Sequence, residues 1–192
     1  MPSASLRQWQ TVRAASLYEI EAAHAAIGGS GRGRRYATQQ VNHAYTVLLS
    51  SQFQGFCRDL HSECADALSD AMTPVVFRPA IRAEFRLHRR LDSGNPNAGN
   101  IGADFGRLGL RFWHTAQAQN RFNARRQAAL EELNRWRNAI AHQDFTSVTV
   151  GGSTVLRLQQ VRQWRRACDG LASSFDAVMY SHLLGVTGIA PW

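Results

Sequence analysis

The stretch that decides the fold is YTVLLSSQFQGFCRDL, residues 45–60. Its apolar residues recur every three or four positions, and the stripe continues to Leu68 without a proline. This period is typical of one face of an α-helix. We therefore predict a long helix from about Tyr36 to Met72, ended by Pro74, whose core stripe is Tyr45, Leu48, Leu49, Gln52, Phe53, Phe56, Leu60, Cys64 and Leu68.

Helical spacing also covers most of the chain on either side. It predicts helices over about 5–27, 79–91, 102–118, 120–141 and 159–184. Between the last two, FTSVTVGGSTVLRL (145–158) alternates apolar and polar residues around two glycines, which indicates a hairpin. The sequence predicts an all-α bundle of five or six helices with a small β-hairpin near 146–158, as one domain over 1–192 with its core at about 36–185.

The charge of the chain favours an anionic partner. All 22 basic residues among the 192 are arginine, against 14 acidic residues, which gives a formal charge of +8. Without lysine there is no Walker A phosphate loop, no Schiff-base chemistry and no kinase-type catalytic lysine. A GC-rich genome also exchanges lysine for arginine, but that does not explain the net charge. Guanidinium suits phosphate, so nucleic acid is the favoured partner.

The cysteines and the N-terminus point to the cytoplasm. Three cysteines are too few for a disulfide framework, and MPSASLRQWQ lacks the apolar region of a signal peptide. No apolar run reaches the roughly 18 residues of a membrane span. Cys57, His61 and Cys64 share a helix face, but seven helical residues rise about 10.5 Å, too far for both thiolates to bind one metal. We expect no metal and no membrane contact.

A glycine-rich segment, GGSGRGRR (28–35), invites comparison with a phosphate-binding loop. It lacks the preceding strand and the following lysine of such loops. We predict a flexible basic loop between helices, whose arginines could touch a phosphate backbone.

The segment with the most chemical content is LEELNRWRNAIAHQDF, residues 130–145. On a helical wheel, Phe122, Leu133, Trp136 and Ile140 form one apolar face, with Arg137 on its flank. On the other side, a polar but mostly uncharged row follows at intervals of four: Asn134, Asn138 and His142.

Arg137 and His142 could together cleave a phosphodiester. A histidine can take the proton of a ribose 2′-hydroxyl, and an arginine can stabilise the charge on the phosphorane. An ideal helix separates the two residues by roughly 140° and 7.5 Å, so they converge only if the helix frays, the arginine wraps around, or two copies of the helix face each other. The structural alternative is that His142 caps the helix and Arg137 pairs with Glu131 or another carboxylate.

This segment resembles the HEPN superfamily of helical-bundle proteins. The family signature is an arginine, four to six residues beginning with a polar one, and a histidine near the end of a helix; here it reads RNAIAH, from Arg137 to His142. The resemblance is greatest to a bacterial branch with an aromatic-acidic-small-aromatic pattern followed by Arg-Asp-Leu. This chain has Phe53-Gln54-Gly55-Phe56 before Arg58, so glutamine replaces the acid, with Asp59 or Glu63 as possible substitutes. The likeness spans about Gln39 to Gly185.

The resemblance implies a metal-independent endoribonuclease that acts as a symmetric homodimer without a cofactor. His142 would be the general acid or base, Arg137 would stabilise the transition state, and Asn138 would support them. RNA contacts would come from the same helix: Arg121, Arg125, Arg126, Arg135 and Asn134. Such proteins serve as toxins or in phage defence, often beside a nucleotidyltransferase antitoxin.

Two alternatives stay open. Gln54 favours a non-catalytic HEPN module that binds RNA or a partner protein. A DNA-binding helical protein is the weaker alternative, because no compact helix-turn-helix spacing is found.

Overall fold

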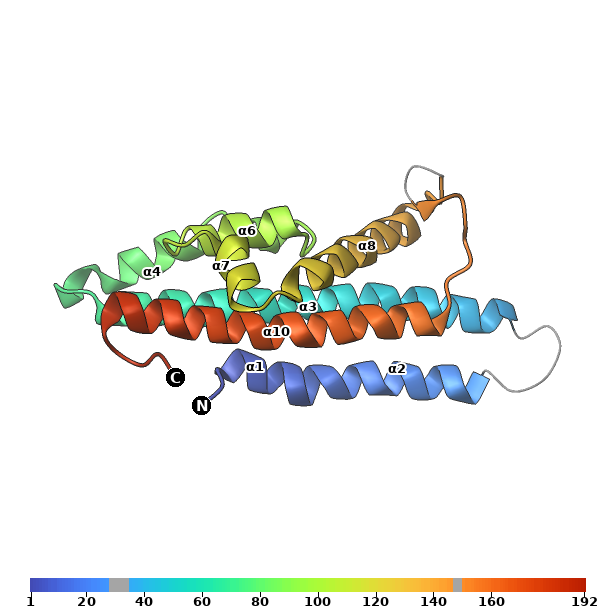
Figure 1. Cartoon of the computed structure of the whole chain (residues 1–192), viewed down its shortest axis with the longest axis horizontal. Coiled ribbons are helices and arrows are strands. Elements are labelled where there is room, and N and C mark those ends of the chain that lie inside the picture. Colours follow the sequence, from blue (N-terminus) through green and yellow to red (C-terminus); the bar gives the residue numbers. More distant parts are fainter. Residues whose placement is uncertain (28–34, 147–149) are drawn as a thin grey trace.

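The structure is a computed structural model that describes residues 1–27, 35–146 and 150–192 (Figure 1). The predicted basic loop GGSGRGRR therefore lies outside the described residues, apart from the backbone of Arg35. No helix of the described part is long and apolar enough to cross a membrane.

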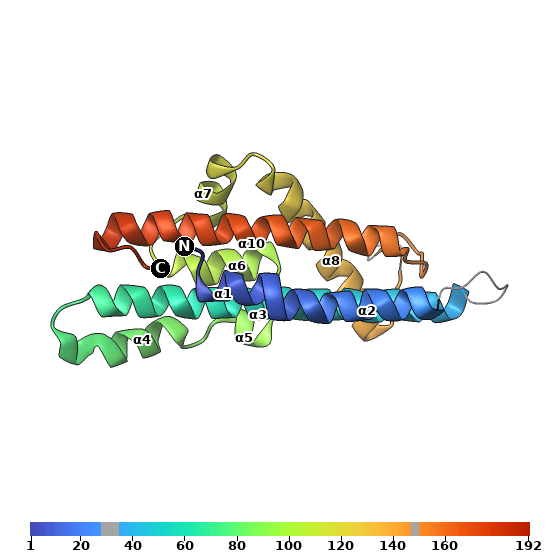
Figure 2. The same ribbon diagram turned by 90° about the horizontal axis from the view of Figure 1, so that it is seen from below.

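Three long helical rods lie side by side and build most of the molecule (Figures 1 and 2). The first comprises α1 (Ala4–Gln8), the π-helical turn η1 (Trp9–Arg13) and α2 (Ala14–Ile27). The others are α3 (Arg35–Ala71) and α10 (Leu158–Thr187). These match the predicted helices over 5–27, 36–72 and 159–184, and both chain termini lie close to α1 (Figure 2).

The region between α3 and the next long helix is more divided than predicted. It forms η2 (Val75–Phe77), α4 (Arg78–Arg86), α5 (Arg90–Ser93), α6 (Ala98–Gly106) and α7 (Phe112–Gln119). The predicted helix over 79–91 breaks at His88, whose φ is 55°, and the one over 102–118 breaks at Gly109, whose φ is 92°. A left-handed residue cannot continue an α-helix. The expected five or six helices are thus too few for the described residues.

The predicted β-hairpin is wrong in the part of 146–158 that the structure describes, which contains no strand; residues 147–149 lie outside it. Gly151 and Gly152 both have a φ of 73°, and residues 153–157 then lead to α10 without regular secondary structure. Side chains of α3 take the place of a partner strand there. Asn42 Nδ2 donates to Leu156 O at 2.8 Å, and Gln39 Nε2 donates to Thr154 O at 2.5 Å.

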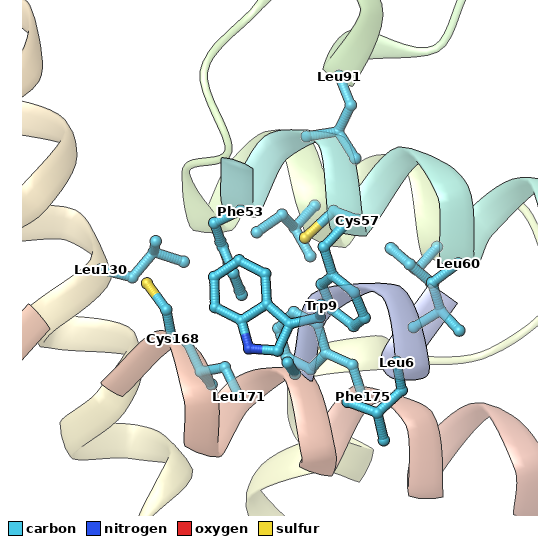
Figure 3. Packing of buried hydrophobic residues seen from close by; sticks show 14 of the residues in the cluster. Leu6, Trp9, Phe53, Cys57, Leu60, Leu91, Leu130, Cys168, Leu171 and Phe175 are labelled. Carbon is cyan, nitrogen blue, oxygen red and sulfur yellow. The ribbon is translucent and has the colours of Figure 1, made fainter. Parts of the chain in front are cut away.

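Aromatic residues from several elements meet in the core (Figure 3). Trp9 of the π turn packs edge-on against Phe53 of α3 at 5.6 Å between ring centroids, and Phe175 of α10 lies 6.1 Å from Phe53. Most of the predicted stripe of α3 is buried, with Tyr45, Leu49, Phe53, Phe56 and Leu60 fully inaccessible, whereas Leu48 and Gln52 are half-buried. The same apolar cluster extends from Leu6 to Leu183, so α3 organises the core on which α8 (Asn123–His142) is laid.

Candidate active site at the end of helix α8

Helix α8 carries every residue of the predicted site except Arg121, which precedes it. The chain enters it through a turn in which Asn120 Oδ1 accepts a hydrogen bond from Phe122 N at 3.0 Å. Leu130, Leu133 and Trp136 are buried against the core, as the wheel predicts. Phe122 was expected on that face but is 55% exposed, because it lies before the first helical turn.

The helix ends sharply after His142. Gln143 adopts a left-handed conformation (φ 54°, ψ 33°), and Asp144 N donates to Ala139 O at 2.9 Å. This is the hydrogen-bond pattern of a Schellman cap. Phe145 then packs near Trp136, at 6.4 Å between ring centroids. His142 is therefore the last residue of a regular helix and not part of a frayed end.

Arg137 is half-buried and is held by amides. Its Nη1 donates to Asn138 Oδ1 at 3.1 Å, and the same oxygen accepts a hydrogen bond of 2.5 Å from Asn95 Nδ2. In the described part of the chain Arg137 forms no ion pair. The alternative partner Glu131 instead accepts a hydrogen bond from Ala98 N at 2.5 Å. Among the described residues, no carboxylate therefore balances the guanidinium charge of Arg137.

His142 is exposed, and its ring forms no hydrogen bond with any other described residue. Because α8 is regular from Arg137 to His142, the two side chains leave its axis about 140° apart. Fraying of the helix is excluded as the way they converge. A site that uses both on one phosphate needs the long arm of Arg137 to wrap around the helix, or a second copy of α8.

Asn134 has a structural role, which corrects its prediction as an RNA contact. It is 4% exposed, and its Nδ2 donates to Pro96 O and to Leu130 O, both at 3.0 Å. Its Oδ1 accepts a hydrogen bond from Ser50 Oγ at 3.2 Å. Asn134 and Asn138 therefore face α3 and the segment 94–97, whereas His142 is exposed. Both amide hydrogens of Asn134 are used within the fold.

The segment 94–97 between α5 and α6 is the part of the site that sequence reasoning missed. It supplies Asn95, and it is tied to α3 by Gln54 Nε2, which donates to Leu91 O at 2.7 Å and to Gly94 O at 2.9 Å. The run of Asn, Pro and Gly in DSGNPNAGN (92–100) indicated only a loop. Nothing in it showed that this loop would contact Asn134 and Asn138, which lie 38 and 43 positions after their partners in the loop.

The proposed substitutes for the missing acid have other partners. Asp59 Oδ2 accepts a hydrogen bond of 2.6 Å from Arg13 Nη2. Glu63 caps the first helix, where it accepts hydrogen bonds from Ala4 N at 2.8 Å and Ser5 N at 3.0 Å. Neither is hydrogen-bonded to Arg137. The hydrogen bonds that connect α3 to this region come from Gln54, which holds the segment 94–97, and from Ser50, which holds Asn134.

The other arginines predicted to contact RNA differ in their freedom. Arg121, Arg125 and Arg135 are exposed. Arg126 is half-buried, and its Nη1 donates to Asn123 Oδ1 at 2.9 Å and to Gly170 O at 3.3 Å. Arg126 thus joins α8 to α10, whereas the other three can reach a ligand.

Cys57, His61 and Cys64 point into the core. Burial raises the pKa of both thiols well above the usual value and lowers the pKa of His61 to about 4. His61 Nε2 lies 3.2 Å from Asp104 O. Within the described residues, no three His, Cys, Asp or Glu side chains are arranged to hold a metal ion.

Comparison with known proteins adds no relative: no family model matches the chain, and neither a curated protein nor a solved structure is significantly similar to it.

Proposed function

We propose that this protein is a metal-independent endoribonuclease of the HEPN type, active as a homodimer. The observation that carries the proposal is the state of Arg137: a half-buried guanidinium, held in place by Asn138 and without a carboxylate partner in the described chain. Such a group is prepared for the charge of a phosphorane. His142 lies exposed at the end of the same helix and can exchange a proton with the 2′-hydroxyl or the leaving oxygen.

A dimer can bring the two side chains together although they leave one helix about 140° apart. If two copies of α8 meet across a two-fold axis, His142 of one chain lies beside Arg137 of the other, and the one cleft between them contains two such pairs. The attack of the 2′-oxygen on the adjacent phosphorus breaks the bond to the 5′-oxygen, which takes the proton. The products are a 2′,3′-cyclic phosphate and a 5′-hydroxyl.

The test combines cleavage with subunit complementation. Purified protein should cleave single-stranded RNA in EDTA, whereas His142→Ala and Arg137→Ala should each lose at least 100-fold in rate. His114→Ala, which removes an exposed histidine from α7, is the matched control and should keep full activity. Activity that survives in His142→Ala, or that needs added metal, would overturn the assignment.

Mixing the two inactive variants tests the shared cleft. A mixed dimer has one complete pair, His142 from one chain and Arg137 from the other, so a subunit-exchanged mixture should regain about a quarter of the wild-type rate. If both groups acted from one chain, a mixed dimer would contain no complete pair and no activity would return.

In the cell, we propose the role of a toxin or phage-defence effector, held in check by an antitoxin of the nucleotidyltransferase type. Expression of the protein should stop growth, and expression of His142→Ala should not. Equal toxicity of the two would contradict this role.

A second candidate is a non-catalytic HEPN module that binds RNA or a partner protein. The 140° between Arg137 and His142 in one chain favours it, because without a second copy the pair does not face one phosphate. RNA binding without cleavage, unchanged in His142→Ala, would select this alternative.

A further inference from the structure

A groove lies where α8 packs on α10, on the flank of α8 away from Asn134. Its central part has a volume of about 680 Å³ and is lined by Arg125 and Arg135 of α8 and by Arg166 of α10. Two neighbouring depressions of about 350 Å³ extend it. One shares Gln160 and Gln163 with the centre and adds Arg157; the other shares Arg126 and adds Ser173. We call the three together the α8–α10 trough.

The trough is long enough for an extended polymer. Its lining follows α10 from Arg157 to Ala177, which at 1.5 Å per residue is about 30 Å. A stacked strand rises about 3.4 Å per nucleotide, so the trough could accommodate up to about nine nucleotides. That is within the range of about 4–16 nucleotides found for single-strand-binding sites.

The trough also holds much of the unpaired positive charge. Five arginines line it, and in the described chain none of them forms an ion pair: Arg125, Arg126, Arg135, Arg157 and Arg166. Elsewhere, arginines such as Arg58 and Arg162 do pair with carboxylates. Among the described residues that line it, the only acidic one is Glu132. One of its oxygens accepts hydrogen bonds from Trp164 Nε1 at 3.1 Å and Gln160 Nε2 at 3.3 Å.

An exposed aromatic side chain stands at the edge of this charged surface. Phe122 is 55% exposed and lines the central part, and the Arg121 guanidinium lies 5.2 Å from its ring centroid. Arg121 covers one face of this ring, and the other face can stack on an unpaired base. A base inside a duplex has no free face to offer, so this feature favours a single strand.

We propose that the α8–α10 trough is the binding track for single-stranded nucleic acid, with Phe122 as its stacking platform. This proposal rests on the proposed function, because only the nuclease activity would make the bound strand a substrate. It differs from the sequence prediction in adding a second helix, through Arg157 and Arg166, and in using Arg126 to hold the two helices together. The sugar-phosphate chain is the recognised chemistry, so RNA and DNA strands both bind.

The test measures binding to a fluorescein-labelled 12-nucleotide RNA, the same sequence as DNA, and the corresponding duplex, over a salt series with the full-length chain. The DNA strand has no 2′-hydroxyl and so reports binding apart from cleavage. We expect both single strands to bind at least fivefold more tightly than the duplex. For single strands, log K falls with log salt by about 0.7 per phosphate neutralised.

Two variants separate the charge from the stacking. Arg125→Gln/Arg166→Gln should weaken binding about tenfold at 0.1 M salt and reduce the salt slope by about 1.4, which is two phosphates at about 0.7 each. Phe122→Ala should weaken binding at least fivefold and leave the slope unchanged. The matched control is Arg58→Gln/Arg162→Gln, which removes the same charge from exposed, ion-paired positions outside the trough.

The proposal would be overturned if the trough and control double variants weakened binding equally, or if the duplex bound as tightly as the single strands. Full competition by poly-glutamate at matched charge would also overturn it, because it would assign the surface to an acidic protein. The two proposals can fail separately. If the trough binds single strands but the protein does not cleave RNA in EDTA, only the proposed nuclease activity is rejected. If RNA is cleaved and the trough variants do not affect this cleavage, only the proposed binding track is rejected.

Discussion

Asn95 and Asn138 are joined by a hydrogen bond of 2.5 Å, in which Asn95 Nδ2 donates to the same Oδ1 that accepts from Arg137. A loop that precedes α6 is thereby connected to the second residue of the RNAIAH motif. Asn95 is hydrogen-bonded to Asn138 and not to Arg137, so we assign it the role of positioning Asn138, and through it the guanidinium of Arg137.

We expect Asn95→Ala to lower kcat for RNA cleavage about tenfold, with little change in KM or Tm, because a small misplacement of a charged group costs rate more than binding. The loop itself stays in place, since its fold uses the backbone carbonyl of Asn95, which accepts from Asn97 N and Asn100 Nδ2 at 2.8 Å. Single-turnover kinetics and thermal melts check both expectations.

The control for this variant is Asn97→Ala on the same loop. Asn97 Oδ1 accepts a hydrogen bond from Asn100 N at 2.8 Å and caps α6, so its loss should cost about 1 kcal/mol of stability and leave kcat unchanged below Tm. A fall in kcat in both variants, in proportion to stability, would reduce Asn95 to a structural residue.

Gln54→Glu restores the acid of the family pattern, and we expect it to destabilise the protein by about 2 kcal/mol at neutral pH. The amide of Gln54 donates to two carbonyl oxygens, whereas a carboxylate has no hydrogen to donate and repels both. The loss should shrink as pH falls and the carboxyl group becomes protonated, because a protonated carboxyl donates one hydrogen bond. Urea unfolding at several pH values measures this.

Gln54→Met is the reference, since it removes the donor without adding charge. If Gln54→Glu were as stable as wild type at neutral pH, or more stable, the two hydrogen bonds would not explain why this chain has glutamine here.

The long helices and the site motif were predictable from sequence because they are local patterns. The stripe from Tyr45 to Leu68 specifies a helix by its period alone, and Arg137 to His142 lie within six residues. What sequence reasoning missed depends on distant contacts. Asn42 of α3 donates a hydrogen bond to the Leu156 carbonyl where a hairpin was expected. Asn95, in the loop before α6, donates a hydrogen bond to Asn138. Alternation around Gly151 and Gly152 could not show that α3 would satisfy this backbone.

Gly55 is the small residue of the pattern on α3, and it makes room for Arg13. A Cβ at position 55 would lie 2.5 Å from Arg13 Nη1. That guanidinium cannot move freely, because it donates to Gln52 Oε1 at 2.8 Å and to Asp59 Oδ2 at 2.6 Å. In a helix, alanine is more favourable than glycine by about 1 kcal/mol of folding free energy. Disrupting the two hydrogen bonds of Arg13 would cost about 2 kcal/mol. This figure is kept low because Asp59 is 43% exposed, so that solvent weakens its ion pair with Arg13.

We therefore expect Gly55→Ala to destabilise the wild type by about 1 kcal/mol but to stabilise an Arg13→Ala background by about the same amount. Chemical denaturation of the four proteins in this cycle measures the reversal of sign. The same effect of Gly55→Ala in both backgrounds would show that Arg13 is not what requires glycine.

His61 should make the protein less stable in mild acid. Burial, and secondarily the nearby positive charge of Arg89, lowers its pKa to about 4, against 6.5 for an ordinary histidine. Above pH 6.5 both the folded and the unfolded chain hold it neutral. As pH falls from 6.5 to 4 the unfolded chain takes up a proton that the folded chain does not, so this residue lowers the free energy of unfolding by up to about 1.4 kcal/mol per pH unit.

His61→Gln keeps a side-chain nitrogen that can donate to Asp104 O but does not titrate, so its stability should fall less steeply than that of wild type between pH 6.5 and 4. His114→Gln removes an exposed histidine and serves as the control, with a curve that should parallel wild type. Parallel curves for His61→Gln and wild type would show that the proton taken up in acid binds elsewhere. The contrast between the two histidines separates a burial effect from the overall loss of carboxylate charge, which every variant shares.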